Sequence, residues 1–407
     1  TGGDVKSAVA MLEGFVSYVL LTQEAAVLYV DSSRVSEEAL DYLKKNGVAV
    51  RPYREILDGI AAIDVPTVML VSVENVNYRL YLAMEENPRV TIVKGEEPVF
   101  CLKAVKNPVE IANTKNAHIK EGVAMARLQM CLEEKLAAGE TVSETDVGEL
   151  LVDFRKEQEG YMEDSFAVIA AYGANAAMMH YHPTPENHAV LQRKGFLLLD
   201  PGGQYVDGTT DTTRTYALGE LTDEERRYYT YVLKANIGIA RTVFMEGCSG
   251  ANLDIMSRTQ IWKYGLDYRC ATGHGVGFVG PIHEGPQSLR MTNHVPFQPG
   301  MTITDEPGIY EEGLVGVRIE NELLVVEHME TKYGKFYAFQ PITYLPIDTT
   351  PVVLELMNEE EISWLNDYHQ MVCKDCCLLC EIIHRQQRFS QNKQNYCQYN
   401  SYGNIDH

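Results

Sequence analysis

The stretch FLLLDPGGQYVDGTTDTTRTYAL, residues 196–218, holds two β-prone runs that flank a reversal containing glycine and aspartate. Such a pattern predicts a β-hairpin. We place its turn near Tyr205 and Val206. That turn sets Asp200 directly opposite Asp211. Directly opposed residues on antiparallel strands have Cβ atoms about 4.5 to 5.5 Å apart, and like charges at that distance repel each other. The two carboxylates are therefore expected to face a cation.

A second stretch repeats the arrangement, MTITDEPGIYEEGLVGVRIENELLVVE at residues 301–327. Gly313 lies midway between Glu306 and Glu320, and Pro307 helps to end the first strand. This second pair of carboxylates is therefore expected to be opposed across a hairpin as well. Four carboxylates placed in this way need cations between them.

Between the hairpins, His274 lies in the motif ATGHGVG, where flanking glycines leave the backbone room to bring the imidazole close to other groups. One histidine and four carboxylates form a hard, oxygen-rich ligand set. It suits Mn²⁺, or Co²⁺, Fe²⁺ or Zn²⁺ according to availability, and disfavours a thiolate zinc site. Two such ions about 3.5 to 4 Å apart generate hydroxide at neutral pH and stabilise a developing oxyanion. The motifs together therefore predict a hydrolytic dinuclear site with the ligands Asp200, Asp211, His274, Glu306 and Glu320.

A plainer interpretation is that these acids are solvated strand residues. The chain has 57 Asp and Glu, and most such residues lie at protein surfaces. The joint occurrence of DGTTDTTRT, GHGVG, HEGP, DEPG and RIEN in one stretch favours a site over that interpretation. Arg214 in TTRT is expected to orient a ligating carboxylate, since metal-binding carboxylates are commonly hydrogen-bonded in turn.

At these residues the chain resembles the pita-bread metallopeptidases, and among them the Xaa-Pro aminopeptidases (aminopeptidase P). The resemblance runs from about Phe15 to about Val372. It implies an α+β protein with a pita-bread (creatinase/aminopeptidase) catalytic domain and a smaller N-terminal α/β domain. It also implies that the five residues above are the metal ligands, and that Asp211 and Glu320 bridge both ions.

The resemblance implies substrate-binding residues as well. His180 in MMHYHP and His283 in HEGP match substrate-facing histidines, and Arg318 and Tyr310 match residues that line a proline pocket. Glu306 is the expected proton carrier, with His283 and His180 also in catalytic roles. The chain departs from the family pattern in YRCATGHG, where Cys270 stands in place of a pocket histidine, so the details of substrate preference do not follow from the resemblance.

The function implied is that of a metal-dependent aminopeptidase that releases the N-terminal residue from peptides with proline in second position. The alternatives are a prolidase, which shares the ligands but cleaves only Xaa-Pro dipeptides, creatinase-like chemistry without metal, and a non-catalytic pita-bread module that binds a protein. The complete ligand set disfavours the last two.

The net charge and the hydropathy of the chain limit the kinds of molecule it can bind. A net charge of −22 disfavours nucleic acid and anionic membranes, because both are polyanions. No apolar run approaches the roughly 20 residues that span a bilayer, and no basic segment followed by an apolar one begins the chain, so a cytoplasmic protein is expected. We expect a proline-containing peptide as substrate and, from the resemblance, a homodimer.

The domain organisation is expected to comprise an N-terminal α/β domain (1–107), a catalytic domain (108–345), a helical segment (346–372) and an atypical tail (373–407). The first residue is not methionine, and related enzymes carry another domain upstream, so a fragment is expected. Within the catalytic domain, two helices followed by a hairpin, twice over, suggest a duplicated half. Ser143 with Asp146 and Thr222 with Glu225 indicate helix starts.

The tail holds five of the nine cysteines and is rich in Gln and Asn. Zinc binding is conceivable but disfavoured, because a structural zinc site usually draws on two separated ligand pairs. A disordered or locally helical tail is the preferred interpretation. The zinc alternative concerns Cys373, Cys376, Cys377, Cys380 and His384.

Overall fold

The computed structural model describes residues 16–22, 24–73, 76–95 and 98–375. The chain forms two compact units, one ending at Lys103 and one beginning at Ala104, and each is considered by itself. Four of the five residues of the zinc alternative lie outside the described ranges, namely Cys376, Cys377, Cys380 and His384. None of the helices in the described ranges is long and apolar enough to span a bilayer.

The first unit is a small α/β unit with two sheets. Strand β2 pairs antiparallel with β1 and parallel with β3, and β4 and β5 form a parallel pair. The strands are β1 (Ser17–Leu21), β2 (Ala26–Val30), β3 (Val48–Pro52), β4 (Thr67–Val71) and β5 (Val90–Lys94). The helices are η1 (Ser32–Arg34), α2 (Glu37–Lys45), η2 (Tyr53–Glu55), α3 (Ile56–Ala61) and α4 (Tyr78–Glu86).

The second unit contains the helices and hairpins that concern function. Helix α5 (Pro98–Ala104) spans the boundary between the units. The helices of the second unit are α6 (Pro108–Ala138), α7 (Glu144–Lys156), η3 (Gly173–Ala177), α8 (Asp223–Ala240), α9 (Gly250–Trp262), η4 (Leu354–Leu356) and α10 (Glu359–Asp375). Its strands before α8 are β6 (Tyr161–Asp164), β7 (Ile169–Tyr172), β8 (Phe196–Asp200), β9 (Gly203–Tyr205), β10 (Gly208–Thr209) and β11 (Arg214–Ala217). Those after α8 are β12 (Val243–Met245), β13 (Gly273–His274), β14 (Ser288–Leu289), β15 (Thr302–Asp305), β16 (Gly308–Glu311), β17 (Val315–Arg318), β18 (Asn321–Thr331) and β19 (Gly334–Pro341).

Local sequence signals explain where these helices begin. Ser143 and Thr222 cap α7 and α8 as expected, because each hydroxyl accepts the backbone N–H three residues on. The acids at those positions, Asp146 and Glu225, bond back to the cap backbone and complete a capping box at each helix. A third box, formed by Asn107, begins α6, and Gly139 in the left-handed conformation ends it.

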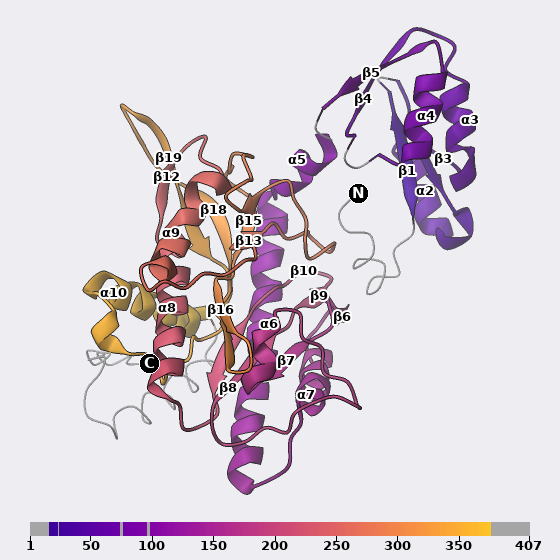
Figure 1. Cartoon of the computed structure of the whole chain (residues 1–407). Coiled ribbons are helices and arrows are strands. Elements are labelled where there is room, and N and C mark those ends of the chain that lie inside the picture. Colours follow the sequence, from indigo (N-terminus) through magenta and orange to yellow (C-terminus); the bar gives the residue numbers. More distant parts are fainter. Residues whose placement is uncertain (1–15, 23, 74–75, 96–97, 376–407) are drawn as a thin grey trace, which may run out of the picture. The chain divides into compact units, whose positions relative to one another are not determined.

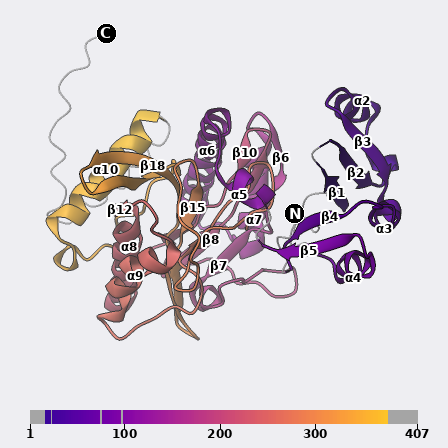
Figure 2. The same ribbon diagram turned by 90° about the horizontal axis from the view of Figure 1, so that it is seen from above.

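The expected repetition of two helices and a hairpin is present. Helices α6 and α7 precede the strands β8 to β11, and helices α8 and α9 precede the strands β15 to β18 (Figure 1). Helix α8 packs against α9 and against β15, β16 and β17, while α6 packs against α7 and β10. The view from above shows α8 and α9 together and α6 apart from them (Figure 2). The fold class is therefore α+β, as expected.

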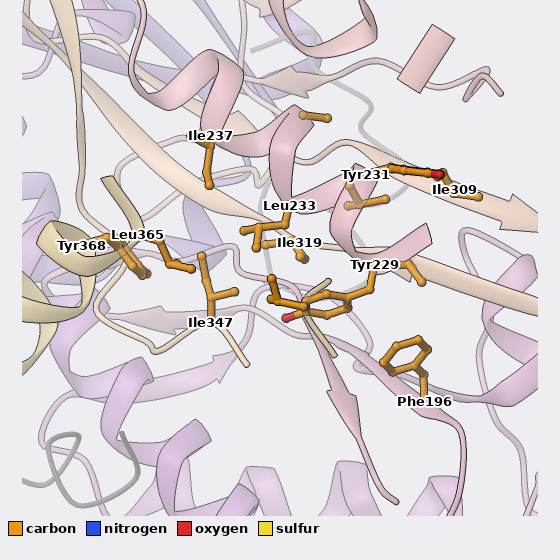
Figure 3. Packing of buried hydrophobic residues seen from close by; sticks show 14 of the residues in the cluster. Phe196, Tyr229, Tyr231, Leu233, Ile237, Ile309, Ile319, Ile347, Leu365 and Tyr368 are labelled. Atoms are coloured by element: carbon orange, nitrogen blue, oxygen red, sulfur yellow. The ribbon is translucent and has the colours of Figure 1, made fainter. Parts of the chain in front are cut away.

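The largest apolar cluster lies around α8 and receives side chains from the second hairpin and from α10. Tyr229 and Leu233 of α8 are fully buried, and the ring of Tyr229 stacks on Phe196 with centroids 5.6 Å apart. Figure 3 shows Leu365 and Tyr368 of α10 at the other end of the cluster from Phe196. Truncating such a buried leucine to alanine typically costs about 2 to 5 kcal/mol. The cluster therefore fixes the second hairpin against α8.

Helix α10 extends further than expected. We place the start of the atypical tail at residue 373, but α10 continues through Asp375. Cys373 is partly buried and packs against the cluster around α8. The helix continues past residue 372 because Cys373 still packs against this cluster.

His369 of α10 makes a pH-dependent contribution to stability. Its Nε2 accepts the N–H of Ile347 at 3.1 Å, and burial followed by the charge of Arg214 lowers the pKa of His369 to about 4. The unfolded state binds a proton below about pH 6.5 and the folded state only below about pH 4, so stability should fall as the pH drops through this window.

His369→Gln removes the titrating group and keeps an uncharged acceptor. Between pH 7 and pH 5 the wild type should therefore lose about 2 kcal/mol more of unfolding free energy than this variant. Urea unfolding of both proteins at the two pH values measures the difference. An equal loss in the two proteins would show that folding does not lower the pKa of His369.

Candidate metal centre

The first acidic pair lies in a hairpin whose register differs from expectation by two residues. Gly208 pairs with Tyr205 in β10 and β9, and Arg214 pairs with Leu199 in β11 and β8. Both pairs of strands place the centre of the turn between Val206 and Asp207. Asp200 therefore lies opposite Thr213. The prediction that it lies opposite Asp211 was wrong. A shift of two preserves the side-chain face, so Asp200 and Asp211 lie diagonally on one face.

The second acidic pair has the expected register. Gly308 pairs with Arg318 in β16 and β17, and Asp305 pairs with Asn321 in β15 and β18. Glu306 and Glu320 lie between these two ladders and face each other across the hairpin. Gly313, at φ 74°, occupies the left-handed turn conformation that a glycine adopts without strain.

His274 is brought to the acids by a short strand. It ends β13, which pairs with β14, and its backbone N–H donates to Thr304 Oγ1 at 3.0 Å. Gly273 has to be glycine, because a Cβ there would lie 1.7 Å from the carbonyl oxygen of Thr304. This close approach places the imidazole next to the second hairpin.

The predicted ligands converge. His274 Nε2 lies 3.4 Å from Asp211 Oδ2 and 3.4 Å from Glu306 Oε1. One ligand atom from each of Asp211, His274 and Glu320 falls within 4.8 Å of the others. Asp200 is linked to this group through Arg318, as described below.

The carboxylates strongly perturb one another. Burial raises the pKa of Asp211 well above its usual value, and Asp200 and Glu306 raise it further. Burial likewise raises the pKa of Glu320, assisted by the charges of Asp211 and Glu306. Buried like charges in such proximity disfavour ionisation unless cations compensate them.

A carboxylate oxygen without a hydrogen-bond partner also favours a bound divalent ion at this site. Asp200 Oδ1 is buried and has no hydrogen-bond partner among the described residues. A buried carboxylate oxygen without a partner is unfavourable, typically by about 1 to 3 kcal/mol or more. Four carboxylates and one imidazole without a thiolate suit Mn²⁺, Fe²⁺, Co²⁺ or Zn²⁺.

Arg318 supplies the fixed positive charge of the site. It is buried and donates from Nη2 to Asp200 Oδ2 at 2.5 Å, from Nη1 to the Tyr310 hydroxyl at 2.8 Å and from Nε to Thr213 Oγ1 at 3.1 Å. Thr213 in turn donates to Glu320 Oε2 at 2.7 Å. Arg318 therefore connects one ligand of each hairpin, a contact that the sequence does not reveal.

Arg214 does not have the role expected for it. Among the described residues its guanidinium donates to no carboxylate and bonds instead to backbone carbonyls, including that of Glu320, and to Tyr368. Since alternate residues of a strand point to opposite faces, Arg214 points away from the face of Asp211 and Thr213. It braces the backbone next to the ligand and does not orient a carboxylate.

The two histidines that are predicted to face the substrate, His180 and His283, are both exposed. The ring of His283 meets that of His274 edge to face, with centroids 4.2 Å apart. Although one side of His283 is open to solvent, the surrounding protein lowers its pKa to about 3, helped by the neighbouring His274 and His180. His283 is therefore neutral at pH 7 and can donate one N–H. His180 is exposed.

Cys270 and Tyr310 both lie close enough to Glu306 for its charge to act on them. Both are partly buried and pack against the edge of the cluster around α8. Burial raises the pKa of the Cys270 thiol to about 11, and the charge of Glu306 raises it further. The thiol is therefore neutral at pH 7 and acts as a small apolar group next to Tyr310.

Two threonines were missed at the sequence level. Thr213 links Glu320 to Arg318, and Thr304 accepts from the His274 backbone and donates to Glu306 Oε1 at 3.3 Å. Each stands two residues from a ligand, so strand alternation puts it on the ligand face. That spacing was the available signal.

Three family models match the chain. They are metallopeptidase family M24 over residues 112–327, the creatinase/prolidase N-terminal domain over residues 8–110, and the C-terminal region of peptidase M24 over residues 335–379. The expectation of a pita-bread metallopeptidase with a creatinase-like N-terminal domain is thereby confirmed.

Similar proteins carry related names. Aminopeptidase P2 of Arabidopsis thaliana is 37% identical over 413 residues, covering 93% of this chain and 58% of the plant protein. X-prolyl aminopeptidase from Caenorhabditis elegans, described as a cytosolic enzyme with a di-nuclear active site, superposes with a TM-score of 0.83 at 31% identity, covering 93% of this chain and 62% of that one. Xaa-Pro dipeptidase from Bacillus anthracis has a TM-score of 0.64 at 28% identity, covering 82% and 88%. The chain thus spans about three fifths of the length of the first two proteins.

Proposed function

The chain belongs to metallopeptidase family M24, and from that membership and the convergent ligand set we propose that it is a Xaa-Pro aminopeptidase. It hydrolyses the bond between an N-terminal residue and a following proline. The observation that carries the proposal is the grouping of Asp211, His274 and Glu320 within 4.8 Å, with Glu306 against the same imidazole. The names of the relatives support the choice of substrate class.

The site would hold two divalent ions. Asp200, Asp211, His274, Glu306 and Glu320 would hold them, and Asp211 and Glu320 would contact both. Mn²⁺ is the first choice and Co²⁺, Fe²⁺ or Zn²⁺ the alternatives, because the donors are mainly carboxylate oxygens. When bound, the ions supply a hydroxide nucleophile at neutral pH and Lewis acidity at the scissile carbonyl.

The chain's own groups handle protons and orientation. Burial raises the pKa of Glu306, while His274 and Arg318 oppose that rise, so its carboxylate suits proton transfer from nucleophile to leaving proline nitrogen. Neutral His283 donates a hydrogen bond to the developing oxyanion. Exposed His180 positions the substrate at the entrance.

The proline pocket is proposed on the side of Tyr310 and Cys270. Arg318, which the resemblance places in the pocket, has its guanidinium committed to Asp200, Tyr310 and Thr213. Its contribution is therefore to hold Tyr310 and Asp200 in place. The apolar ring and the neutral thiol provide the surface that a proline ring requires.

A prolidase is the nearest competing function, and peptide length separates the two. We expect release of the first residue from an Xaa-Pro-Xaa tripeptide at a rate well above that for the Xaa-Pro dipeptide. Chromatographic detection of both products with purified, Mn²⁺-loaded protein decides the matter. Cleavage of the dipeptide alone would establish a prolidase, and cleavage of neither would favour a non-catalytic module.

Cellular setting and assembly are further parts of the proposal. We place the protein in the cytoplasm as a homodimer, in line with the cytosolic description of the nematode relative for the first part. The net charge of −22 supports peptide substrates over nucleic acid or anionic membrane surfaces. Light scattering of the purified chain tests the dimer.

Cys270 should affect substrate binding more than turnover. Its thiol faces the proposed pocket and is not among the proposed ligands, so Cys270→Ser should keep both metal ions and a turnover within about 2-fold of wild type, with a raised KM for Xaa-Pro peptides. A hydroxyl buried against Tyr310 opposes an apolar proline ring. Steady-state kinetics and metal analysis test this.

Glu306→Gln is the matched comparison. If Cys270→Ser lost a metal ion, or lowered turnover as much as Glu306→Gln does, the cysteine would be a ligand and the assignment of the site would be wrong.

A further inference from the structure

We infer that Asp254 and Arg258, both on helix α9, are positioning residues that fix the loop carrying Cys270 and His274. Residues 266–272 of this loop have no regular secondary structure, so their position depends on bonds to neighbouring elements. The inference rests on the proposed function, because the loop then supplies one metal ligand and one wall of the substrate pocket.

Arg258 holds the loop by its backbone. Its Nη1 donates to the carbonyl of Tyr268 at 2.7 Å and its Nη2 to the carbonyl of Cys270 at 2.8 Å. The guanidinium also lies over the Tyr268 ring, 4.3 Å from its centroid. Two carbonyls two residues apart are thus held by one planar group, a geometry that lysine cannot reproduce.

Asp254 completes the arrangement from the same face of α9. It stands four residues before Arg258, accepts from Arg258 Nε at 2.6 Å through Oδ2, and accepts the Thr272 hydroxyl through Oδ1. Tyr268 OH contacts Thr272 Oγ1 at 2.6 Å. One carboxylate therefore orients the arginine and also fixes the end of the loop.

The loop continues directly into the metal centre. The carbonyl of Thr272 accepts the backbone N–H of Glu306 at 2.8 Å, and two residues later the N–H of His274 donates to Thr304 Oγ1. A displacement of residues 268–272 therefore moves one ligand and changes the backbone contact of another. Displacements of about 1 Å can reduce rates by about 100-fold.

Both side chains of this ion pair are buried, so replacing either one leaves the other without its partner and without water. Asp254 is fully buried, and Arg258 is 5% exposed. A buried ion pair loses much hydration free energy on folding, and this loss is offset only when the remaining donors are bonded. Here Nη1 and Nη2 of Arg258 bond to the carbonyls of Tyr268 and Cys270, and Nη1 also contacts Asp267 Oδ1 at 3.4 Å. The pair has no place in the proposed chemistry, so positioning of the loop is the role that these contacts support.

The test uses the full chain and Co²⁺ as the probe. Arg258→Lys keeps the charge but loses the planar fork, and Thr272→Val removes only the hydroxyl. Each should weaken Co²⁺ binding about 10-fold or more by calorimetry and raise KM for an Xaa-Pro tripeptide. Thr272→Ser restores the hydroxyl and should return both values to within about 2-fold of wild type.

The control is another buried ion pair of the same unit. Lys234 bonds to Glu361 between α8 and α10, and both side chains are less than a tenth exposed. Glu361→Gln should lower the unfolding temperature as Arg258→Lys does, while leaving Co²⁺ affinity unchanged. An equal loss of affinity in this control, or wild-type affinity in folded Arg258→Lys and Thr272→Val, would overturn the inference.

The same experiment separates the two proposals. If the wild type binds Co²⁺ but cleaves no Xaa-Pro peptide, the proposed function is wrong, and the Co²⁺ affinities of the variants still decide whether Asp254 and Arg258 position the loop. If the wild type cleaves the tripeptide and the variants bind Co²⁺ normally, only the inference fails.

Discussion

Asp211→Asn and Glu320→Gln should each abolish most of the activity and remove at least one metal ion. Both side chains lie at the centre of the converging carboxylates and are proposed to contact both ions. Loss of a residue that merely supports a metal ligand typically lowers affinity or activity about 10- to 100-fold, so loss of a shared ligand should exceed about 100-fold. Metal content by mass spectrometry and tripeptide turnover provide the two measurements.

Asp207→Asn is the matched control for these two variants. Asp207 lies in the turn of the first hairpin and binds Lys120 and Asn116, away from His274. An asparagine there keeps a hydrogen-bonding side chain, and a partly exposed ion pair contributes only about 0 to 1 kcal/mol. Comparable metal content and turnover in all three variants would show that the ligands are wrongly assigned.

Removal of metal should have the second large effect. We expect two divalent ions per chain, complete loss of peptidase activity on chelation, and recovery with Mn²⁺ or Co²⁺. Without cations the buried carboxylates of Asp211 and Glu320 repel each other, and their folded pKa values are raised above 3.8 and 4.5. The metal-free fold therefore loses stability as the pH rises above these values, because the folded state binds more protons than the unfolded state.

Thermal unfolding with and without chelator at pH 5 and pH 8 measures this effect. The difference in unfolding temperature between the loaded and the metal-free protein should be larger at pH 8. No more than one ion per chain under saturating metal would rule out the dinuclear centre, even if activity were metal-dependent.

The two hairpins show how far the sequence alone leads. In the second hairpin, Gly313 gives a clear turn signal midway between Glu306 and Glu320, and the register follows from it. In the first hairpin the turn residues are Val206 and Asp207, and the neighbouring glycine, Gly208, already belongs to β10. Our placement of the turn at Tyr205 and Val206 was therefore one residue early. When the turn of a hairpin moves by one residue, each residue pairs with a residue two positions further along the other strand. Side chains therefore stay on the same face of the hairpin. The error in register therefore left the two predicted ligands Asp200 and Asp211 on one face of the hairpin.

The supporting contacts could not be predicted in this way. Arg318 reaches Asp200 across 118 residues of sequence, and three of the four carbonyls that bond to Arg214 lie more than 100 residues away from it. Arg258 is close to its loop in sequence, but its partners are backbone carbonyls, which leave no residue pattern. Side-chain alternation could have found Thr213 and Thr304. It cannot identify a bond to the main chain of another element.

The division of the ligands between two hairpins has a consequence for biosynthesis. Thr213 bonds to Glu320 across 107 residues, so the contacts that assemble the centre have a high contact order. A nascent chain that has emerged only as far as α9 carries Asp200 and Asp211 but none of the other three proposed ligands. Binding of metal by the complete proposed ligand set would therefore require the second hairpin to have been synthesised and paired.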